Sequence, residues 1–347
     1  MPMEASAEKF VIPEKYSRQV LFAPIGPEGQ ERLCQAKAVI VGCGALGAAQ
    51  ASMLARAGVG KLRIIDRDYV EESNLQRQIL FDESDAVQRL PKAVAAEQKL
   101  RQINTDVQAE GVIADVQATN VEDLIGGFDL ILDGTDNFET RFLLNDAAVK
   151  HGIPWIYGAV VSSYGITFTI LPDHTACLSC LLPSSPVGLQ ETCDTAGVIG
   201  PAVSWVSTIQ VSEALKILSG HKENLYGKLL SFDIWQNRFQ QLTLSRDPAC
   251  RTCSMREFHY LEGEAPTHIS MCGRNSVQIH QRDSRQLDLA ALRERLAQFG
   301  PVQGNAYLVQ CRLDPYEFTV FQDGRAIIKG TQDHALARSL YARYVGS

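Results

Sequence analysis

The sequence predicts an α/β protein built on a Rossmann-like, mainly parallel sheet with helices on both faces. Three short apolar runs, 38–41, 62–65 and 129–132, are bounded by Gly, Asp or Pro, as is typical of parallel strands covered on both faces. Between the first two runs, apolar residues recur at helical spacing over 46–57, and Gly58 is a suitable helix stop. This β-α-β order predicts a right-handed crossover and therefore parallel strands.

The same pattern continues toward the middle of the chain. Residues 155–157, 165–170 and 228–232 have the apolar character of buried strands. Residues 201–218 indicate a helix that begins with Pro201, a residue suited to the first helical turn. We therefore expect one α/β unit to occupy most of the chain.

The length of 347 residues corresponds to about two domains. We expect an N-terminal arm over 1–32, an α/β domain over 33–260 and a small α+β domain over 270–347, with a polar linker near 261–270. The last domain has the predicted order β-α-β-β-β-α, with a hairpin turn signal at 323–324. Its strands are expected at 276–279, 307–312, 318–321 and 326–329, and its helices at 288–299 and 335–344.

Composition and charge exclude several classes of protein. Hydrophobic residues make up 45% of the chain and charged residues 21%, which excludes a mainly disordered protein. The 33 basic and 40 acidic residues give a net charge of −7, so we expect no partner among nucleic acids or anionic membranes. No apolar run reaches the roughly 18 residues that a membrane span needs. The N-terminus also lacks the order of a signal peptide, which indicates a cytoplasmic protein.

A glycine motif indicates a nucleotide site after the first predicted strand. Gly42, Gly44 and Gly47 form a G-x-G-x-x-G pattern that opens the following helix, and Asp66 ends the next strand. Glycines let backbone amides approach phosphates at a helix N-terminus, and the carboxylate suits ribose hydroxyls. The motif alone points first to NAD. The alternative is a glycine turn that only lets the helix and the strand pack closely.

Polar and basic residues beside this motif favour ATP chemistry over hydride transfer. Asn74 and Arg77 lie in the segment 73–78, and Lys92 opens another predicted helix. A dehydrogenase has little need for cations that converge on the pyrophosphate, whereas an enzyme that cleaves ATP must stabilise the charge that builds on the phosphates. The alternative is that Arg77 and Lys92 are solvated surface charges.

Two carboxylates follow the predicted strand at 129–132. Asp133 and Asp136 would lie at the carboxyl end of a parallel strand, where open α/β sheets bind ligands. One or both would suit Mg²⁺ bound against a triphosphate, because this ion takes one or two carboxylates together with phosphates. The alternative for Asp136 is a turn in which Asp and Asn cap the following helix, 138–150.

Two C-x-x-C pairs, Cys177 with Cys180 and Cys250 with Cys253, lie about seventy residues apart. Four thiolates in this pattern predict a closed, tetrahedral structural zinc site, to which we assign no catalysis. The nine cysteines are too sparse for a disulfide scaffold, which fits a reducing compartment. A redox C-x-x-C pair or a chance match is the alternative.

The other cysteines divide into three groups. Cys193 lies in a polar loop ahead of the helix at 201–218 and is a candidate nucleophile, with a small loop residue as the alternative. Cys34, Cys43 and Cys311 lie beside or within apolar runs, as core-filling cysteines do. The role of Cys272, at the start of the C-terminal domain, is not decided by its sequence context.

The order of these motifs resembles one family. The chain is similar to the ThiF/MoeB/HesA family, the bacterial relatives of ubiquitin-activating enzymes, over roughly residues 14–255. It is most similar to ThiF-type members that carry an extra C-terminal domain. The resemblance is carried, in chain order, by Tyr16-Ser17-Arg18-Gln19, Gly42 to Gly47, Ser73 to Gln78, Pro91-Lys92, Asp133 to Asn137, the two C-x-x-C pairs and Cys193-x-x-Ala196-Gly197-Val198.

The resemblance implies an adenylation reaction. In the family, the C-terminal Gly-Gly carboxylate of a small ubiquitin-like sulfur carrier, such as ThiS or MoaD, attacks the α-phosphate of ATP and becomes an acyl-adenylate. A persulfide donor such as a cysteine desulfurase then supplies sulfur for a thiocarboxylate, in thiamine or molybdenum cofactor biosynthesis. The resemblance does not specify the carrier, the pathway or the donor.

The resemblance also implies residue roles, cofactors and a homodimer. ATP is the nucleotide, with Mg²⁺ at the active site and Zn²⁺ on the four cysteines. The implied roles are Asp66 on the ribose, Asn74, Arg77 and Lys92 on the phosphates, Asp136 on Mg²⁺, Arg18 in the active site of the other subunit, and Cys193 as a mobile-loop cysteine that links to the carrier or relays sulfur.

Departures from the family pattern are few. Cys43 occupies a loop position that is often aliphatic, and Gly134 replaces a frequent Cys; neither removes a needed contact. The C-terminal domain has no recognisable rhodanese-like loop, and we expect it to dock the carrier or another partner. The main alternative function is an NAD-dependent oxidoreductase on the same fold. A non-catalytic binding module is disfavoured by the retained cations and Asp136.

Overall fold

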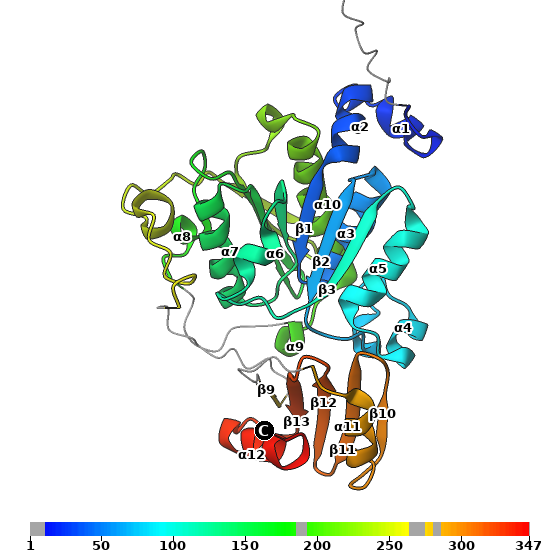
Figure 1. The fold of residues 1–347 in the computed structure, drawn as a ribbon. Helices are drawn as coiled ribbons and strands as arrows, with labels where there is room; N and C mark the ends of the chain where they lie inside the picture. The colour runs from blue at the N-terminus through cyan, green and yellow to red at the C-terminus, as the bar shows by residue number, and fades with distance from the viewer. Residues whose placement is uncertain (1–10, 185–192, 264–274, 280–285, 347) are drawn as a thin grey trace, which may run out of the picture.

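The computed structural model describes residues 11–184, 193–263, 275–279 and 286–346, and it confirms the α/β class (Figure 1). Within these residues the larger sheet has eight strands in the order β3-β2-β1-β4-β5-β6-β7-β8. The first five in this order run parallel, and the last three are antiparallel. The strands are β1 (Lys37–Val41), β2 (Lys61–Asp66), β3 (Gln108–Ile113), β4 (Leu130–Asp133), β5 (Trp155–Val161), β6 (Tyr164–Ile170), β7 (Leu229–Asp233) and β8 (Arg238–Leu242).

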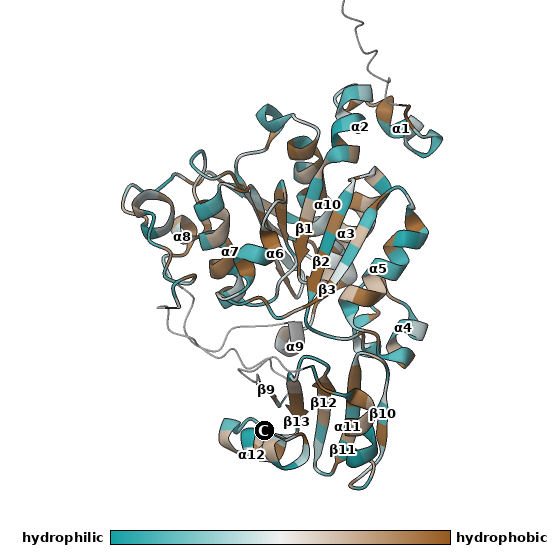
Figure 2. Ribbon diagram, viewed as in Figure 1, coloured by the Kyte–Doolittle hydropathy of each residue, from teal (hydrophilic) through white to brown (hydrophobic). Residues whose placement is uncertain are grey.

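Helices cover both faces of this sheet, as predicted. Alternation along β1 explains the two layers, because Ala38 and Ile40 join one hydrophobic core while Val39 and Val41 join the other. Figure 2 shows the hydrophobic colour gathered in the strands and the hydrophilic colour on outward surfaces such as that of α5. The first core contains α3 (Ala45–Ala57), α5 (Lys92–Ile103) and α10 (Gly200–Leu218), and the second contains α6 (Val121–Ile125) and α7 (Phe138–His151).

The segment before β1 forms helices at the amino ends of the strands. The backbone N–H of Gly60, just before β2, donates to the carbonyl of Leu33 at 2.9 Å, which holds α2 at this end. These N-terminal helices are η1 (Glu14–Tyr16), α1 (Ser17–Val20) and α2 (Gly26–Gln35). The other short helices around the larger sheet are η2 (Glu72–Asn74), α4 (Glu83–Gln88), α8 (Leu178–Leu181), α9 (Cys193–Ala196), η3 (Lys222–Asn224) and η4 (Arg251–Met255).

The outermost strands of the larger sheet, β3 and β8, escaped the sequence analysis. β3 contains Gln, Glu and Gly, and all five residues of β8 are exposed. An edge strand borders solvent and does not need a continuous apolar run. The apolar signal that identified the central strands is therefore weak at both edges.

Residues 275–279 and 286–346, here called the C-terminal unit, form a five-stranded antiparallel sheet with two helices. The strand order is β10-β11-β12-β13-β9. The predicted β-α-β-β-β-α order is short by one strand, because β10 has only three residues and follows Pro301. The elements are β9 (Ser276–Ile279), α11 (Leu289–Leu296), β10 (Val302–Gly304), β11 (Leu308–Leu313), β12 (Tyr316–Phe321), β13 (Ala326–Lys329) and α12 (His334–Tyr344).

The C-terminal unit packs its helices on one face of its sheet and presents the other face to the rest of the molecule (Figure 1). On that second face Leu308, Phe321 and Ile327 pack against Tyr69, which follows β2. Most of the predicted linker lies outside the described residues, at 264–270. Among the helices that the structure describes, none combines the length and the hydrophobicity needed to cross a membrane.

Candidate functional site

The glycine loop lies between β1 and the N-terminus of α3, and its shape is set by close backbone packing. Gly42 has a φ of +86°, in the region that favours glycine. A Cβ on Gly47 or on Gly134 would collide with the carbonyl oxygen of Gly42. Only Gly44 has open space, with Gln78 Nε2 as its nearest neighbour at 3.9 Å from an added Cβ. Of the three loop glycines, Gly44 therefore offers the most room for a ligand, beside the first turn of α3.

The structure explains why a small residue suits position 134. It follows β4, and its backbone N–H donates to the carbonyl of Val41 at 2.8 Å. This places Gly134 directly against Gly42 and Gly47. In this backbone arrangement, a side chain at position 134 would force the facing glycine loop to shift.

Asp66 ends β2 and points its carboxylate at the glycine loop. Its Oδ2 accepts from the backbone N–H of Cys43 at 2.6 Å, and its Oδ1 accepts from the N–H of Asp68 at 2.7 Å. Burial raises the pKa of this carboxyl, while Lys92 and the two N–H donors oppose that shift. Each oxygen has a further lone pair, so the carboxylate can still accept from ribose hydroxyls.

Lys92 brings a buried positive charge to the same place. It is the first residue of α5 and is 6% exposed, with its Nζ 3.7 Å from Asp68 Oδ2. Its charge also acts on Asp66. A solvated surface lysine, the alternative weighed above, does not fit this burial. Asp68 was missed because nothing in its immediate sequence distinguishes it from a loop residue.

The segment 73–78 lies next to the glycine loop. Asn74 is almost fully buried, and Arg77 is partly exposed, with its Nη1 donating to the carbonyl of Ser73 at 2.8 Å. Gln78 is 3% exposed, and its Oε1 has no hydrogen-bond partner in the described structure. Buried acceptors are rarely left unpaired in proteins, which makes Gln78 a candidate ligand contact. Nothing in the sequence around Gln78 distinguishes it from its neighbours.

Asp133 and Asp136, both candidates for Mg²⁺, have different surroundings. Asp133 is fully buried; it accepts from Thr135 Oγ1 at 2.7 Å and lies 3.3 Å from Arg141 Nε. Burial raises the pKa of Asp133, and Arg141 opposes that shift. Asp136 is exposed. The cap of α7 comes from Asn137, which accepts from the backbone N–H of Thr140, so Asp136 is not occupied by capping.

The region of Cys193 also reaches this edge of the sheet. Cys193 begins α9, but its side chain lies outside the described part of the structure, as does the whole of Cys272. The backbone that follows is held by Ser162, whose N–H donates to the carbonyl of Gly197 at 2.8 Å. Gln76 Nε2 donates to the carbonyl of Val198 at 3.4 Å, which links the segment 73–78 to the start of α10.

Among the residues predicted for the nucleotide site whose side chains the structure describes, Arg18 is the one that the chain does not bring to this edge. It is exposed on α1, which packs with α2 at the amino ends of the strands (Figure 1). Its neighbour Gln19 donates to the carbonyl of Ala57, at the end of α3 opposite the glycine loop. Within one chain, Arg18 and Gly44 lie at opposite ends of the sheet.

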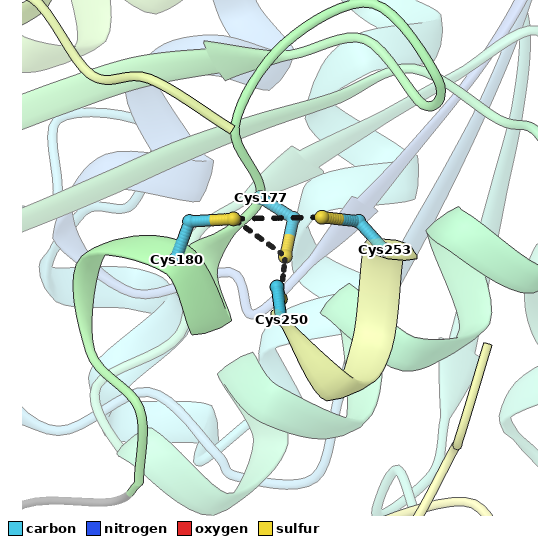
Figure 3. A group of neighbouring side chains, drawn as sticks. All are labelled: Cys177, Cys180, Cys250 and Cys253. Carbon is cyan, nitrogen blue, oxygen red and sulfur yellow. Dashed lines mark hydrogen bonds between the residues drawn. The ribbon is translucent and has the colours of Figure 1, made fainter. Parts of the chain in front are cut away.

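The two C-x-x-C pairs meet in space, as predicted (Figure 3). The four Sγ atoms lie within 4.8 Å of one another, with 3.6 Å between Cys177 and Cys250 and 3.4 Å between Cys180 and Cys253. A tetrahedral zinc ion with Zn–S bonds of about 2.3 Å requires S···S separations of roughly 3.8 Å. The donor set and its spacing therefore fit Zn²⁺.

The surroundings of the cluster support its geometry. Asn145 on α7 donates to Cys177 Sγ at 3.7 Å and accepts from the backbone N–H of Leu178 at 2.8 Å. The backbone N–H of Asp247 donates to Cys180 Sγ at 3.5 Å. The hydrogen bond between Cys177 and Cys180 lowers the pKa of the Cys180 thiol and raises that of Cys177, while burial raises the pKa of Cys250. A bound metal ion would displace the remaining protons, because thiolates are its ligands.

The predicted core-filling cysteines mostly lie in the core. Cys43 and Cys311 are buried, while Cys34 is half-buried and accepts from Gln30 Nε2 at 3.7 Å. Burial raises the pKa of the Cys43 thiol, although this residue lies inside the glycine loop. The side chain of Cys43 is fully buried, and its backbone N–H is paired with Asp66.

The chain is similar in sequence to one family of known proteins. A family model described as the ThiF family matches residues 16–252. A Bacillus subtilis protein named sulfur carrier protein ThiS adenylyltransferase is 51% identical over 336 residues, covering 96% of this chain and 99% of that relative. An Escherichia coli relative of the same name is 38% identical over 240 residues, covering 69% of this chain and 94% of that relative.

The fold is also found among solved structures. A crystal structure of Escherichia coli MccB with ATP matches with a TM-score of 0.62 and 22% identity, covering 69% of this chain and 74% of that chain. At this identity the likeness concerns the fold alone.

Proposed function

The chain belongs to the ThiF family, and from this premise we propose that it uses ATP to adenylate the C-terminal Gly-Gly carboxylate of a small ubiquitin-like sulfur carrier of the ThiS or MoaD type. The observation that carries the proposal is the convergence of Asp66, the buried Lys92 and the segment 73–78 on the open side of the loop at Gly44. The similar proteins bear adenylyltransferase names, and the oxidoreductase alternative has no support among them.

The proposed reaction forms one bond and breaks one bond. A carboxylate oxygen of the carrier attacks the α-phosphorus of ATP, and the bond between the α-phosphorus and the β-bridging oxygen breaks. The electron pair leaves with pyrophosphate, and the carrier becomes an acyl-adenylate. Such a displacement depends on positioning and on charge stabilisation more than on an acid or a base.

The residues around the glycine loop suit this chemistry. Asp66 would accept from the ribose hydroxyls, while Asn74, Arg77 and Lys92 would bind the phosphates. Mg²⁺ would offset the phosphate charge when bound, and the exposed Asp136 fits it better than Asp133, whose oxygens serve Thr135 and Arg141. Asp133 is therefore assigned a structural role.

A protein partner needs a surface at the same edge, and exposed aromatic residues supply one. β5 and β7 end at the carboxyl edge of the sheet, and the side chains beyond them include Tyr164, 57% exposed, and Trp235, 74% exposed. Near the start of the edge strand β8, at the same edge, Phe239 is also exposed. Exposed apolar side chains of this kind mark protein-binding surfaces, which suits a carrier whose tail enters the site.

Arg18 supports a homodimer as part of the proposal. A cation on an arm that lies far from the site of its own chain would act in the site of a second copy. We assign Cys193 to a later step, such as a covalent link to the carrier or transfer of sulfur from a persulfide donor. Adenylation itself would not need it. A cytoplasmic setting would keep these thiols reduced.

Zn²⁺ would hold two distant parts of the chain together. Cys177 precedes the short helix α8 after β6, and Cys180 lies within that helix. Cys250 precedes η4 and Cys253 lies within it, near the end of the adenylation domain, which we place at 33–260. Four thiolates complete a tetrahedral shell and leave no open position for a substrate. The ion would therefore contribute stability and no catalysis.

Isotope exchange between pyrophosphate and ATP tests the proposed function. Adenylation is reversible, so the purified protein with Mg²⁺ and a carrier ending in Gly-Gly should incorporate labelled pyrophosphate into ATP. The matched control is the same carrier without its final glycine, which should give no exchange. Exchange that does not depend on the carrier tail, or a protein that binds NAD in place of ATP, would overturn the proposal.

A further inference from the structure

The face of the C-terminal sheet that carries no helices packs on one short segment of the larger domain, residues 67–71. Alternate residues of the sheet contact alternate residues of this segment. Side chains of a strand alternate between faces, so every second residue around β13 points to the same side. Ala326 and Ile328 point into the core under α11 and α12, and the residues between them point to the segment. Three pairs make contact: Arg325 Nη1 donates to the Arg67 carbonyl at 3.2 Å, Ile327 packs on Tyr69, and Lys329 Nζ lies 2.9 Å from Glu71 Oε1.

The opposite side of this segment is tied to the start of α5. The backbone N–H of Val70 donates to the carbonyl of Leu90 at 2.9 Å. The N–H of Lys92 donates to the carbonyl of Asp68 at 2.8 Å, and Tyr69 and Pro91 form an antiparallel bridge. The segment is thus held between the C-terminal unit and the residues that carry Lys92.

Two hydrogen bonds connect Glu71 to Asn74. The backbone N–H of Glu71 donates to Asn74 Oδ1 at 3.2 Å, and its carbonyl accepts from the N–H of Asn74 at 2.9 Å. Asn74 is 1% exposed, so it has little freedom to find another position. A displacement of Glu71 would therefore move the side chain that is proposed to bind phosphate.

The ion pair between Lys329 and Glu71 is partly shielded from solvent. The exposed fractions of the two side chains are 29% and 21%, and Tyr69, at 6% exposed, covers the pair with a hydroxyl 3.4 Å from Lys329 Nζ. A pair in such surroundings is screened less by water and salt than an exposed pair. It can hold a backbone segment where an exposed pair would contribute little.

We propose that the C-terminal unit is a positioning element of the nucleotide site, in which Lys329 holds Glu71 and thereby fixes Asn74 for phosphate binding. This inference deepens the proposed function and rests on it for the identity of the nucleotide. Lys329 is a positioning residue and does not touch the substrate. Its loss would weaken ATP binding and leave the interaction with the carrier unchanged.

Lys329→Met tests this role, with Lys329→Arg as the conservative variant. In the pyrophosphate exchange assay we expect Lys329→Met to raise the KM for ATP about fivefold, with kcat and the KM for the carrier changed less than about twofold. Lys329→Arg retains the charge and should stay within about twofold of the wild type. Titration calorimetry with ATP and Mg²⁺ should show the same fivefold loss for Lys329→Met without any carrier present.

A matched control disturbs the same interface at another point. Asn305 Nδ2 donates to the carbonyls of Gln88 and Arg89 at 2.9 and 3.1 Å, while its Oδ1 accepts from the N–H groups of Tyr307 and Leu308. Asn305→Asp keeps the acceptor and removes the donor, so it should weaken docking of the unit without changing the KM for ATP. If the KM for ATP rose equally in Lys329→Met and Asn305→Asp, the effect would come from general packing of the unit and not from the Lys329 ion pair.

Glu71→Gln provides a second variant, with almost the same shape, should Lys329→Met fail to fold. If the two residues act through one contact, the double variant should lose no more ATP affinity than either single variant. Unchanged ATP affinity in both single variants would overturn the inference, even with normal exchange in the wild type. A wild type that binds ATP without any carrier-dependent exchange would overturn the proposed function and leave the inference standing if Lys329→Met still weakens ATP binding. A wild type that binds no ATP would overturn both.

Discussion

The four-cysteine cluster and the carboxyl edge of the larger sheet both collect polar groups from distant parts of the chain, but they satisfy these groups differently. In the cluster the Sγ atoms lie within 4.8 Å of one another and have donors from Asn145 and Asp247. At the edge, Asp136 is exposed and Gln78 Oε1 is buried without a partner in the described structure. The cluster is closed around its own ligand atoms, as a structural metal site is, whereas an exposed carboxylate and an unpaired buried acceptor leave room for a substrate.

The largest effect is expected from Asp136→Asn. This change removes the carboxylate proposed for Mg²⁺, so pyrophosphate exchange should fall by at least about 100-fold. The melting temperature should not change, because the side chain is exposed. Exchange assays and thermal unfolding on one preparation measure both quantities. Undiminished exchange would remove the magnesium assignment.

Two other carboxylates serve as controls for that variant. Asp133→Asn leaves the buried charge of Arg141 without its partner, and should lower the free energy of unfolding by about 3 kcal/mol. Asp123→Asn removes an exposed charge on α6 and should change neither exchange nor stability. This pattern would separate loss of the metal from loss of charge and from loss of the fold.

Cys180→Ser should affect stability first and activity second. Removal of one thiolate opens the tetrahedral shell, so zinc content should fall and the free energy of unfolding should drop by at least about 2 kcal/mol. Metal analysis and thermal unfolding measure the two losses. Cys34→Ser, outside the cluster, should retain the zinc. A zinc content that stays the same in Cys180→Ser would refute the four-thiolate site.

Gln78→Met tests whether one buried acceptor at the edge of the sheet, Gln78 Oε1, contacts the ligand. If Oε1 awaits a donor from the ligand, its loss should weaken ATP binding by roughly fivefold, the size of one hydrogen bond, with little change in stability. Gln30→Met is the contrast, because the Gln30 amide already bonds Gln19 and Ala57. That variant should lose stability and keep its ATP affinity. Calorimetry and melting curves distinguish the two, and equal ATP affinity in Gln78→Met and wild type would exclude the contact.

The smallest effect is expected from Cys193→Ala. The proposed division of labour gives this residue a step after adenylation, so exchange should stay within about twofold of the wild type. Formation of the thiocarboxylate, followed by mass spectrometry of the carrier, is the step that should suffer. Loss of exchange in this variant would contradict the division.

Most of the fold could be predicted because burial on both faces leaves a clear pattern in the sequence. The central strands β1, β2 and β4 contain runs of buried apolar residues and were found, whereas the edge strands β3 and β8 were not, since solvent on one side removes that signal. β10 was missed because three residues carry too little pattern. The short helices of the N-terminal segment were not predicted either.

The candidate site was predictable where spacing alone encodes the chemistry. The glycine motif and the four cysteines have such spacing, and the structure brings each set together. The separate surroundings of Asp133 and Asp136 could not be predicted, because they depend on Arg141, eight residues further along the chain, and on the cap at Asn137. The contact between Lys329 and Glu71 joins residues far apart in the sequence, and no local sequence pattern predicts it.

The interlocked backbones of Gly42, Gly47 and Gly134 have a consequence for how tightly a nucleotide is held. A loop so crowded has one shape before any ligand arrives, so almost no conformational entropy remains to be lost there on association. Differences in affinity among variants and relatives should then originate in the looser segments that surround the loop. Selection or engineering of a new nucleotide preference would act on those segments and leave the three glycines unchanged.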